Sequence, residues 1–245
     1  MASIQFSTPI NAIILDIEGT IAPITFVKDV LFPYFLKTVP KTLSQLKYPI
    51  SSSSQDPIEL IVSNFSETIT QSQESLTNHI NDLVSKDIKD STLKSLQGYI
   101  WQEGYESGEL KAPIYADGIS NLKKWTSKGK KVYIYSSGSI KAQKLLFKYV
   151  DINNETHDLN GYLSGYFDIT TSGFKFEPSS YSNILKDIAF NPDETLFLSD
   201  NVKEVKAALD NNINSLIVIR EGNAPLSDED LKVSKTITSF YQLDI

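Results

Sequence analysis

Two acidic residues one position apart follow a short apolar stretch near the start of the chain. Residues 11–15 are almost wholly apolar, and Asp16 and Glu18 come directly after them, followed by Gly19 and Thr20. Such a run, bounded by turn residues, predicts a strand buried on both faces of a parallel sheet, with the acids at its carboxyl end. Open α/β sheets bind their ligands at that edge. The alternative is that the two acids only cap a turn.

Four more polar side chains follow apolar stretches or stand in the adjoining loops: Ser136, Ser137, Lys175 and Asp200. Because the carboxyl ends of parallel strands open on one edge, all four are expected to converge with the first two acids. Together they meet the needs of a magnesium-assisted phosphoryl site. The metal takes oxygen ligands, hydroxyls and a lysine hold phosphate, and a carboxylate attacks phosphorus. Each position alone also fits a plainer role, the serines and Asp200 as helix caps and Lys175 as a surface residue.

The elements that must position these residues alternate along the second half of the chain. Strands are predicted at 131–135, 166–168, 195–199 and 216–219, and helices at 117–127, 140–150, from 178 onward and at 202–210. This alternation predicts an α/β fold with a doubly wound parallel sheet. Residues 25–112 carry helical patterns without a strand, which predicts an all-helical domain inserted into a core formed by residues 1–24 and 113–245.

Composition excludes several functions. The 245 residues carry a net charge of −7, which argues against a protein that binds nucleic acid by neutralising its phosphates. The absence of cysteine excludes disulfides, thiolate metal sites and a cysteine nucleophile. No apolar stretch is long enough to cross a bilayer and no secretory signal is evident, so no membrane partner is expected. The expected compartment is the cytoplasm, with the nucleus as a second one. A monomer is expected, but the oligomeric state stays open, since nothing marks an exposed interface.

The sequence resembles the haloacid dehalogenase-like hydrolase superfamily at four motifs. The motifs are the run of residues 16–20 and the positions Ser136, Lys175 and Asp200. A closer similarity, to the bifunctional enolase-phosphatases of methionine salvage, also called acireductone synthases, is carried by residues 23–27, 97–101, 133–139 and 142–147. It extends through residues 222–226 and so covers nearly the whole chain; the serine-rich stretch near Ser51 is the least recognisable part.

The resemblance implies a small phosphate ester as substrate and one Mg²⁺ per subunit as cofactor. The implied reaction enolises 2,3-diketo-5-methylthiopentyl-1-phosphate and then removes phosphate to give the acireductone. Asp16 is then the nucleophile that forms an aspartyl-phosphate, and Glu18 is the acid and base. The residues implied to hold the metal are Asp16, Glu18 and Asp200, with Glu204 behind them, and those implied to hold phosphate are Ser136, Ser137 and Lys175. The inserted helices resemble the cap of these enzymes, which closes over the site.

The chain departs from the family pattern near two of the motifs. The usual Ile-Gly-X-Lys is Ser172-Gly173-Phe174-Lys175 here, and Asn201 and Lys203 stand between Asp200 and Glu204. In addition, Ile21-Ala22 replaces the more usual threonines. We expect the changes near Lys175 and Asp200 to affect substrate affinity more than the reaction, and the change at Ile21-Ala22 to alter the loop beside Asp16.

Two other functions stay open. One is a phosphatase for a different small phosphate ester, without enolisation, and the other is a catalytically silent binding protein of the same fold. The base for enolisation is not identified by the sequence. Glu103 and Tyr105 are candidates by their position in the helical insert.

Overall fold

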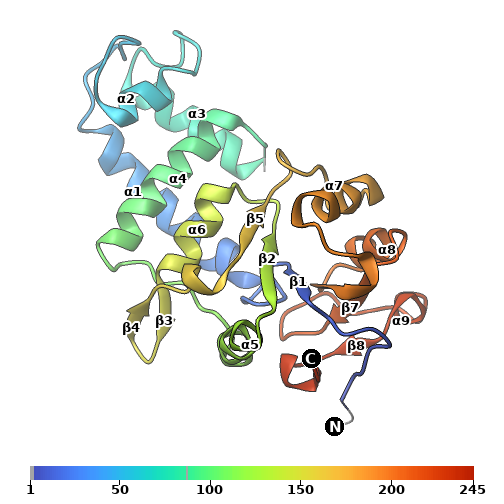
Figure 1. The fold of residues 1–245 in the computed structure, drawn as a ribbon. Coiled ribbons are helices and arrows are strands. Elements are labelled where there is room, and N and C mark those ends of the chain that lie inside the picture. Colours follow the sequence, from blue (N-terminus) through green and yellow to red (C-terminus); the bar gives the residue numbers. More distant parts are fainter. Residues whose placement is uncertain (1–2, 87) are drawn as a thin grey trace. The chain divides into compact units, whose positions relative to one another are not determined.

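A computed structural model of the protein describes residues 3–86 and 88–245 and divides the chain into two compact units (Figure 1). The first unit consists of Met1–Phe26 and Lys111–Ile245, and the second of Val27–Leu110. The boundaries expected from the sequence, after residue 24 and before residue 113, lie within two residues of these.

A parallel sheet forms the centre of the first unit, with six strands among the described residues. The strands are β1 (Ala12–Leu15), β2 (Lys131–Tyr135), β5 (Gly165–Phe167), β6 (Thr195–Ser199), β7 (Asn214–Val218) and β8 (Thr236–Ile237). Their order is β5-β2-β1-β6-β7-β8, so the chain leaves the central strand β1 in one direction and later returns to build the other side. The predicted α/β fold with a doubly wound sheet is confirmed.

Helices cover both faces of this sheet. They are α5 (Ala116–Ser127), α6 (Ile140–Lys148), α7 (Pro178–Ile188) and α8 (Val202–Leu209), followed by the short α9 (Asp230–Val233). Right-handed crossovers place α5 and α6 on the face opposite α7 and α8, because the two pairs connect strands in opposite directions. Figure 1 shows α5 on one side of the sheet and α7 and α8 on the other. Ile14 and Phe197, paired in register, point to the α7 face and pack against Tyr181 and Ile184.

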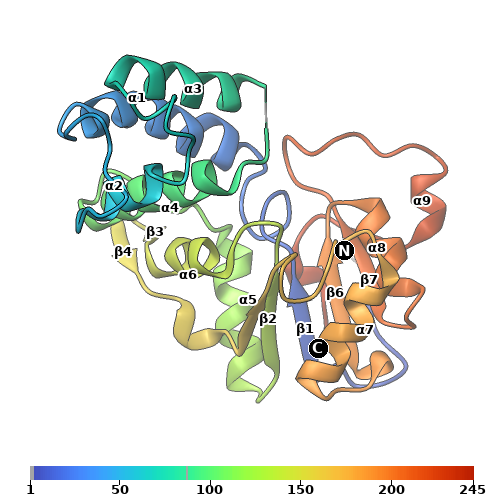
Figure 2. The ribbon, with the colours of Figure 1, turned by 90° about the horizontal axis from the view of Figure 1, so that it is seen from above.

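The second unit consists of helices and connecting loops, with no strand among its described residues (Figure 2). A π-helical segment, Val27–Leu31, runs into α1 (Phe32–Leu43), followed by α2 (Pro57–Val62), α3 (Gln73–Ser85) and α4 (Ser91–Glu106). Asp56, Ser72 and Asp90 cap the last three helices through side-chain hydrogen bonds. Apolar side chains of all four helices form a core of their own, so this unit buries its apolar surface independently of the sheet.

The helix expected at 140–150 is shorter than predicted. It ends at Lys148, and Val150 opens a hairpin of β3 (Val150–Ile152) and β4 (Glu155–His157). The two turn residues, Asn153 and Asn154, have φ of 56° and 67°. Asparagine tolerates this left-handed conformation, which two-residue hairpins require, and the Asn-Asn pair was the overlooked signal.

Candidate active site

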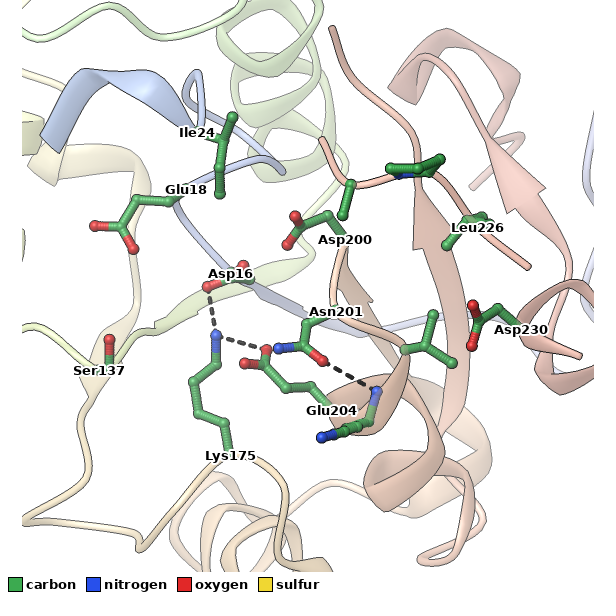
Figure 3. A pocket seen from close by; sticks show the side chains of 14 residues that line it. Asp16, Glu18, Ile24, Ser137, Lys175, Asp200, Asn201, Glu204, Leu226 and Asp230 are labelled. Carbon is green, nitrogen blue, oxygen red and sulfur yellow. Dashed lines mark hydrogen bonds and ion pairs between the residues drawn. The ribbon is translucent and has the colours of Figure 1, made fainter. Parts of the chain in front are cut away.

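One pocket of the first unit gathers five of the six predicted site residues (Figure 3). Asp16, Glu18, Ser137, Lys175 and Asp200 line a cavity of about 440 Å³. They come from the loops that follow β1, β2, β5 and β6, at the carboxyl edge of the sheet. Glu204, from the first turn of α8, also faces the pocket (Figure 3), and residues 224–226 are part of its lining.

The loop after β1 presents its two acids without using them to build the turn. The carbonyl of Ile17 accepts the backbone N–H groups of Thr20, Ile21 and Ala22 at 3.2, 3.0 and 2.9 Å. Among the described residues, no backbone N–H of the turn donates to the carboxylate of Asp16 or Glu18. Neither carboxylate caps the backbone of the turn, and the capping interpretation is wrong.

Gly19 allows this loop to pass close to Asp200. Its φ is +75°, a left-handed conformation that favours glycine, and a Cβ there would lie 2.5 Å from Oδ2 of Asp200. The hydroxyl of Thr20 links Asp16 to Asp200. It donates to Oδ2 of Asp16 at 3.3 Å and accepts the backbone N–H of Asp200 at 3.1 Å. Thr20, which sequence reasoning did not single out, thus joins the loop after β1 to the loop after β6.

Lys175 lies inside the pocket, and its side chain is only 8% exposed. Its ammonium group forms ion pairs with Oδ1 of Asp16 and, at 2.7 Å, with Oε2 of Glu204. The hydroxyl of Tyr181 donates to the Lys175 carbonyl at 2.7 Å and fixes its backbone. Gly173, with φ of +110°, permits the preceding turn, since a Cβ there would meet Oγ of Ser180 at 2.5 Å. The alternative of a surface lysine is therefore wrong.

The pKa values in the pocket reflect burial and crowding of like charge. Burial, together with the charge of Asp16, raises the pKa of Glu18 to about 7. Burial and the charges of Asp16 and Glu204 likewise raise the pKa of Asp200 to about 7. Burial alone would lower the pKa of Lys175, but the carboxylates of Asp16 and Glu204 outweigh it and raise that pKa. The lysine is therefore charged, and the carboxylates around it carry an excess of negative charge.

Helix capping, the alternative role for Ser136, Ser137 and Asp200, is performed by neighbouring residues. Ser139 caps α6 by accepting the N–H of Ala142 at 3.3 Å, and Asn201 caps α8 by accepting the N–H of Lys203 at 3.0 Å. Asn201, a departure from the family pattern, thus has a structural role.

The two predicted phosphate-binding serines differ in position. Ser136 is buried, is absent from the pocket lining, and accepts the N–H of Gly138 at 3.2 Å. Ser137 is exposed and lines the pocket on the same side as the carboxyl group of Glu18 (Figure 3). The structure thus brings Ser137, but not the hydroxyl of Ser136, to the other site residues.

Two other sequence features have clear positions. Phe174 is 51% exposed, stacks on Phe176 with ring centroids 5.5 Å apart, and is not part of the pocket lining. In the helical unit, Glu103 is exposed on α4 whereas Tyr105 is 3% exposed. Burial raises the pKa of Tyr105, which makes its phenolate a poor candidate for a base.

The chemistry of the pocket donors fits a hard cation. Within the described part of the chain, no three His, Cys, Asp or Glu side chains converge as a ready-made metal cage. The pocket instead presents the carboxylates of Asp16, Glu18, Asp200 and Glu204, of which Asp16 and Glu204 form ion pairs with Lys175. Mg²⁺ is usually bound by one or two carboxylates and keeps several waters, so a full protein cage is not required.

Comparison with known proteins places these features in a family. Residues 10–211 match the family model described as haloacid dehalogenase-like hydrolase. The chain is 54% identical to enolase-phosphatase E1 of Candida tropicalis, an alignment that covers 96% of this chain and 99% of that protein. It is also 54% identical to enolase-phosphatase E1 of Debaryomyces hansenii, with 99% of both chains covered. Among solved structures, the unknown transcript 4 protein of Saccharomyces cerevisiae is similar, with a TM-score of 0.82, 47% identity, and coverage of 94% of this chain and 98% of that one.

Proposed function

The chain belongs to the enolase-phosphatase E1 family of haloacid dehalogenase-like hydrolases, and on that premise we propose that it is a magnesium-dependent bifunctional enolase-phosphatase. The proposed substrate is 2,3-diketo-5-methylthiopentyl-1-phosphate, and the products are the acireductone 1,2-dihydroxy-3-keto-5-methylthiopentene and phosphate, a step of L-methionine salvage. The ion pair that joins Lys175 to Asp16 inside an otherwise acidic pocket is the observation that carries this proposal.

Phosphoryl transfer begins at Asp16, whose carboxylate oxygen attacks phosphorus to form an aspartyl-phosphate. The bond from phosphorus to the substrate oxygen breaks, and that oxygen takes the proton of Glu18. The ammonium group of Lys175 stabilises the negative charge on the transferring group, and the hydroxyl of Ser137 donates to a phosphate oxygen. In the second step, Glu18 takes a proton from water, the water attacks phosphorus, and phosphate leaves with Asp16 regenerated.

The pKa of Glu18, raised to about 7, suits these two opposite tasks. A carboxyl group with its pKa near the working pH populates both the acid form needed in the first step and the base form needed in the second. The position of Glu18 supports the same assignment, because it is half-buried beside Asp16, lines the pocket and has no ion-pair partner among the described residues.

We propose that Asp16 and Asp200 hold the metal through carboxylate oxygens, with Glu18 contributing its carboxyl or its main-chain carbonyl. When bound, Mg²⁺ supplies positive charge that offsets the carboxylates and polarises the phosphoryl oxygens. The crowding of carboxylates that helps to raise the pKa values of Glu18 and Asp200 marks the place where a bound cation would stabilise the charged forms.

The proposed cap is the helical unit, Val27–Leu110, and its enolisation base is Glu103 rather than Tyr105. Glu103 is exposed on α4 and can ionise, whereas Tyr105 is packed inside the unit, where burial raises its pKa. A carboxylate that removes a proton next to a carbonyl performs ordinary general-base catalysis.

The decisive experiment is turnover of the diketone phosphate, followed by both phosphate release and ultraviolet absorbance of the enol product. The enolase-phosphatase gives both signals with Mg²⁺ and loses phosphate release when a chelator removes the metal. A plain phosphatase releases phosphate from p-nitrophenyl phosphate without producing the enol from the diketone. A silent binding protein gives neither signal, and that result would end the proposal.

Glu18→Gln is expected to lower steady-state turnover of p-nitrophenyl phosphate by about 10²-fold, because general acid and base catalysis by one group is typically of this size or larger. The good leaving group of this ester departs without a proton, so Asp16 still accepts phosphate while the amide fails to activate water. Acid quenching with a ³²P-labelled substrate should therefore trap more phosphoenzyme than in wild type. Equal trapping at equally low turnover would contradict this division of roles between Asp16 and Glu18.

A further inference from the structure

Arg220 is the only arginine in the sequence, and it is buried just after β7. Its side chain is 8% exposed, and its guanidinium carbon lies 4.4 Å from the ring centroid of Tyr115 and 4.8 Å from that of Phe240. Packing of a planar cation against two aromatic rings is an arrangement that a lysine ammonium cannot reproduce. Arg220 does not line the pocket, so it does not touch the substrate.

One side of the guanidinium is anchored away from the pocket. Nη1 of Arg220 forms an ion pair with Oδ2 of Asp117 at 3.0 Å and donates to the carbonyl of Thr238 at 3.2 Å. The same oxygen of Asp117 accepts from the hydroxyl of Ser239 at 2.8 Å and from the N–H of Phe240 at 2.7 Å. These contacts fix Arg220 to α5 and to the chain that follows β8.

The other side of Arg220 reaches the loop that carries Asp16. Its Nε donates to the carbonyl of Thr20 at 3.0 Å. A second side chain after β7 holds the neighbouring carbonyl, since Nδ2 of Asn223 donates to Gly19 at 2.9 Å. Because β6 lies between β1 and β7, Arg220 spans the end of the strand from which Asp200 emerges.

Thr20 transmits this restraint to both acids. Its hydroxyl donates to Oδ2 of Asp16 at 3.3 Å and accepts the backbone N–H of Asp200 at 3.1 Å. A shift of the Thr20 backbone therefore moves the hydroxyl that orients the Asp16 carboxylate. Arg220 bonds the Thr20 carbonyl itself from outside the pocket, while Asn223 holds the carbonyl of Gly19 next to it.

We propose that Arg220 is a positioning residue that holds the loop after β1 through the Thr20 carbonyl and thereby aims the Asp16 carboxylate at phosphorus. This role rests on the proposed phosphatase chemistry. The positioning role differs from phosphate binding, because in the proposed mechanism Lys175 and Ser137 hold the phosphate independently of Arg220. Replacement of Arg220 is therefore expected to lower the rate of phosphoryl transfer and to leave the affinity for the ester unchanged.

The test compares Arg220→Lys with wild type in the hydrolysis of p-nitrophenyl phosphate at a temperature where melts show both proteins fully folded. Lysine keeps the charge beside Asp117 but loses the directional bond to Thr20. We expect kcat to fall by about tenfold or more, the scale of effect that small misplacements of reacting groups have, while KM stays close to that of wild type.

Asp117→Asn is the matched control. It removes the charge partner of Arg220 but leaves the Nε bond to Thr20, the Thr238 carbonyl and the two rings in place. We expect a lower melting temperature with kcat near wild type. If both variants lose kcat in proportion to their loss of melting temperature, or if Arg220→Lys keeps the wild-type kcat, Arg220 acts only in stability and the proposal is overturned.

Hydrogen–deuterium exchange supplies a readout that does not depend on turnover. Positioning predicts that Arg220→Lys raises deuterium uptake selectively in the segment 16–22, whereas a purely structural role predicts a uniform rise over the first unit. Wild-type hydrolysis of the ester tests the proposed function separately. If wild type is inactive, the phosphatase assignment fails, and unchanged exchange at 16–22 would then also overturn the role of Arg220.

Discussion

Asp16→Asn is expected to lower phosphate release by about 10⁴-fold or more, a loss comparable to removal of covalent nucleophiles in other hydrolases. An amide cannot form the acyl-phosphate and is a poorer magnesium ligand than a carboxylate. The measurement is steady-state release from p-nitrophenyl phosphate and from the diketone phosphate, together with trapping of the phosphoenzyme, which should be absent. Near-normal release by this variant would end the assignment of Asp16 as the nucleophile.

The same variant should be at least as stable as wild type. The charge of Asp16 contributes to the raised pKa values of Glu18 and Asp200, so it repels both neighbours in the folded state. Asparagine removes that repulsion, its Oδ1 still accepts from Lys175, and Lys175 keeps Glu204 as an ion-pair partner. A thermal melt followed by circular dichroism should give an unchanged or higher midpoint, which is the trade-off expected where function places like charges together. A large drop in the midpoint would mean that Asp16 holds the fold together.

Lys175→Met is expected to lower both activity and stability. Loss of one fixed cation that stabilises the transferring group costs about 10³-fold in kcat in comparable sites. Methionine also leaves the carboxylates of Asp16 and Glu204 buried without their ion-pair partner. Removal of one member of a buried ion pair costs about 3 kcal/mol or more, and for a chain of this size that lowers the melting midpoint by about 6 °C or more.

Lys203→Met is the control for Lys175, because Lys203 is exposed and lines the same pocket without an ion pair among the described residues. It should keep kcat and the melting midpoint near their wild-type values. Equal losses in the two variants would mean that only the general charge of the pocket matters. Unchanged kcat and KM in Lys175→Met would remove Lys175 from the proposed mechanism.

The charge balance of the pocket explains why replacement of Asp16 and replacement of Lys175 are expected to change stability in opposite directions. Asp16 is one of several carboxylates, so its neutralisation relieves repulsion, whereas Lys175 is the cation that two of them share. Two variants that both lose most of their activity but shift the melting midpoint in opposite directions separate catalytic from structural roles more sharply than activity measurements alone.

Local patterns in the sequence determined which residues arrive at the active edge of the sheet. The apolar runs before Asp16 and Asp200 form β1 and β6 because wholly apolar strands are stable only when both faces are buried. Gly19 and Gly173 are likewise readable from sequence as turns, since their positive φ is open to glycine at little cost. The convergence of Asp16, Lys175 and Asp200 follows from those elements and from the parallel topology.

Tertiary structure alone decided which polar side chains meet. Ser136 and Ser137 are adjacent in sequence and chemically identical, yet only Ser137 lines the pocket, because successive residues after a strand point in different directions. Arg220 has no local pattern that marks it; its partners Thr20, Asp117 and Thr238 are distant in the chain, and only the sheet order β1-β6-β7 brings them within its reach. Strand and turn chemistry is local and therefore readable from sequence, whereas hydrogen bonds between distant segments depend on packing that the whole fold sets.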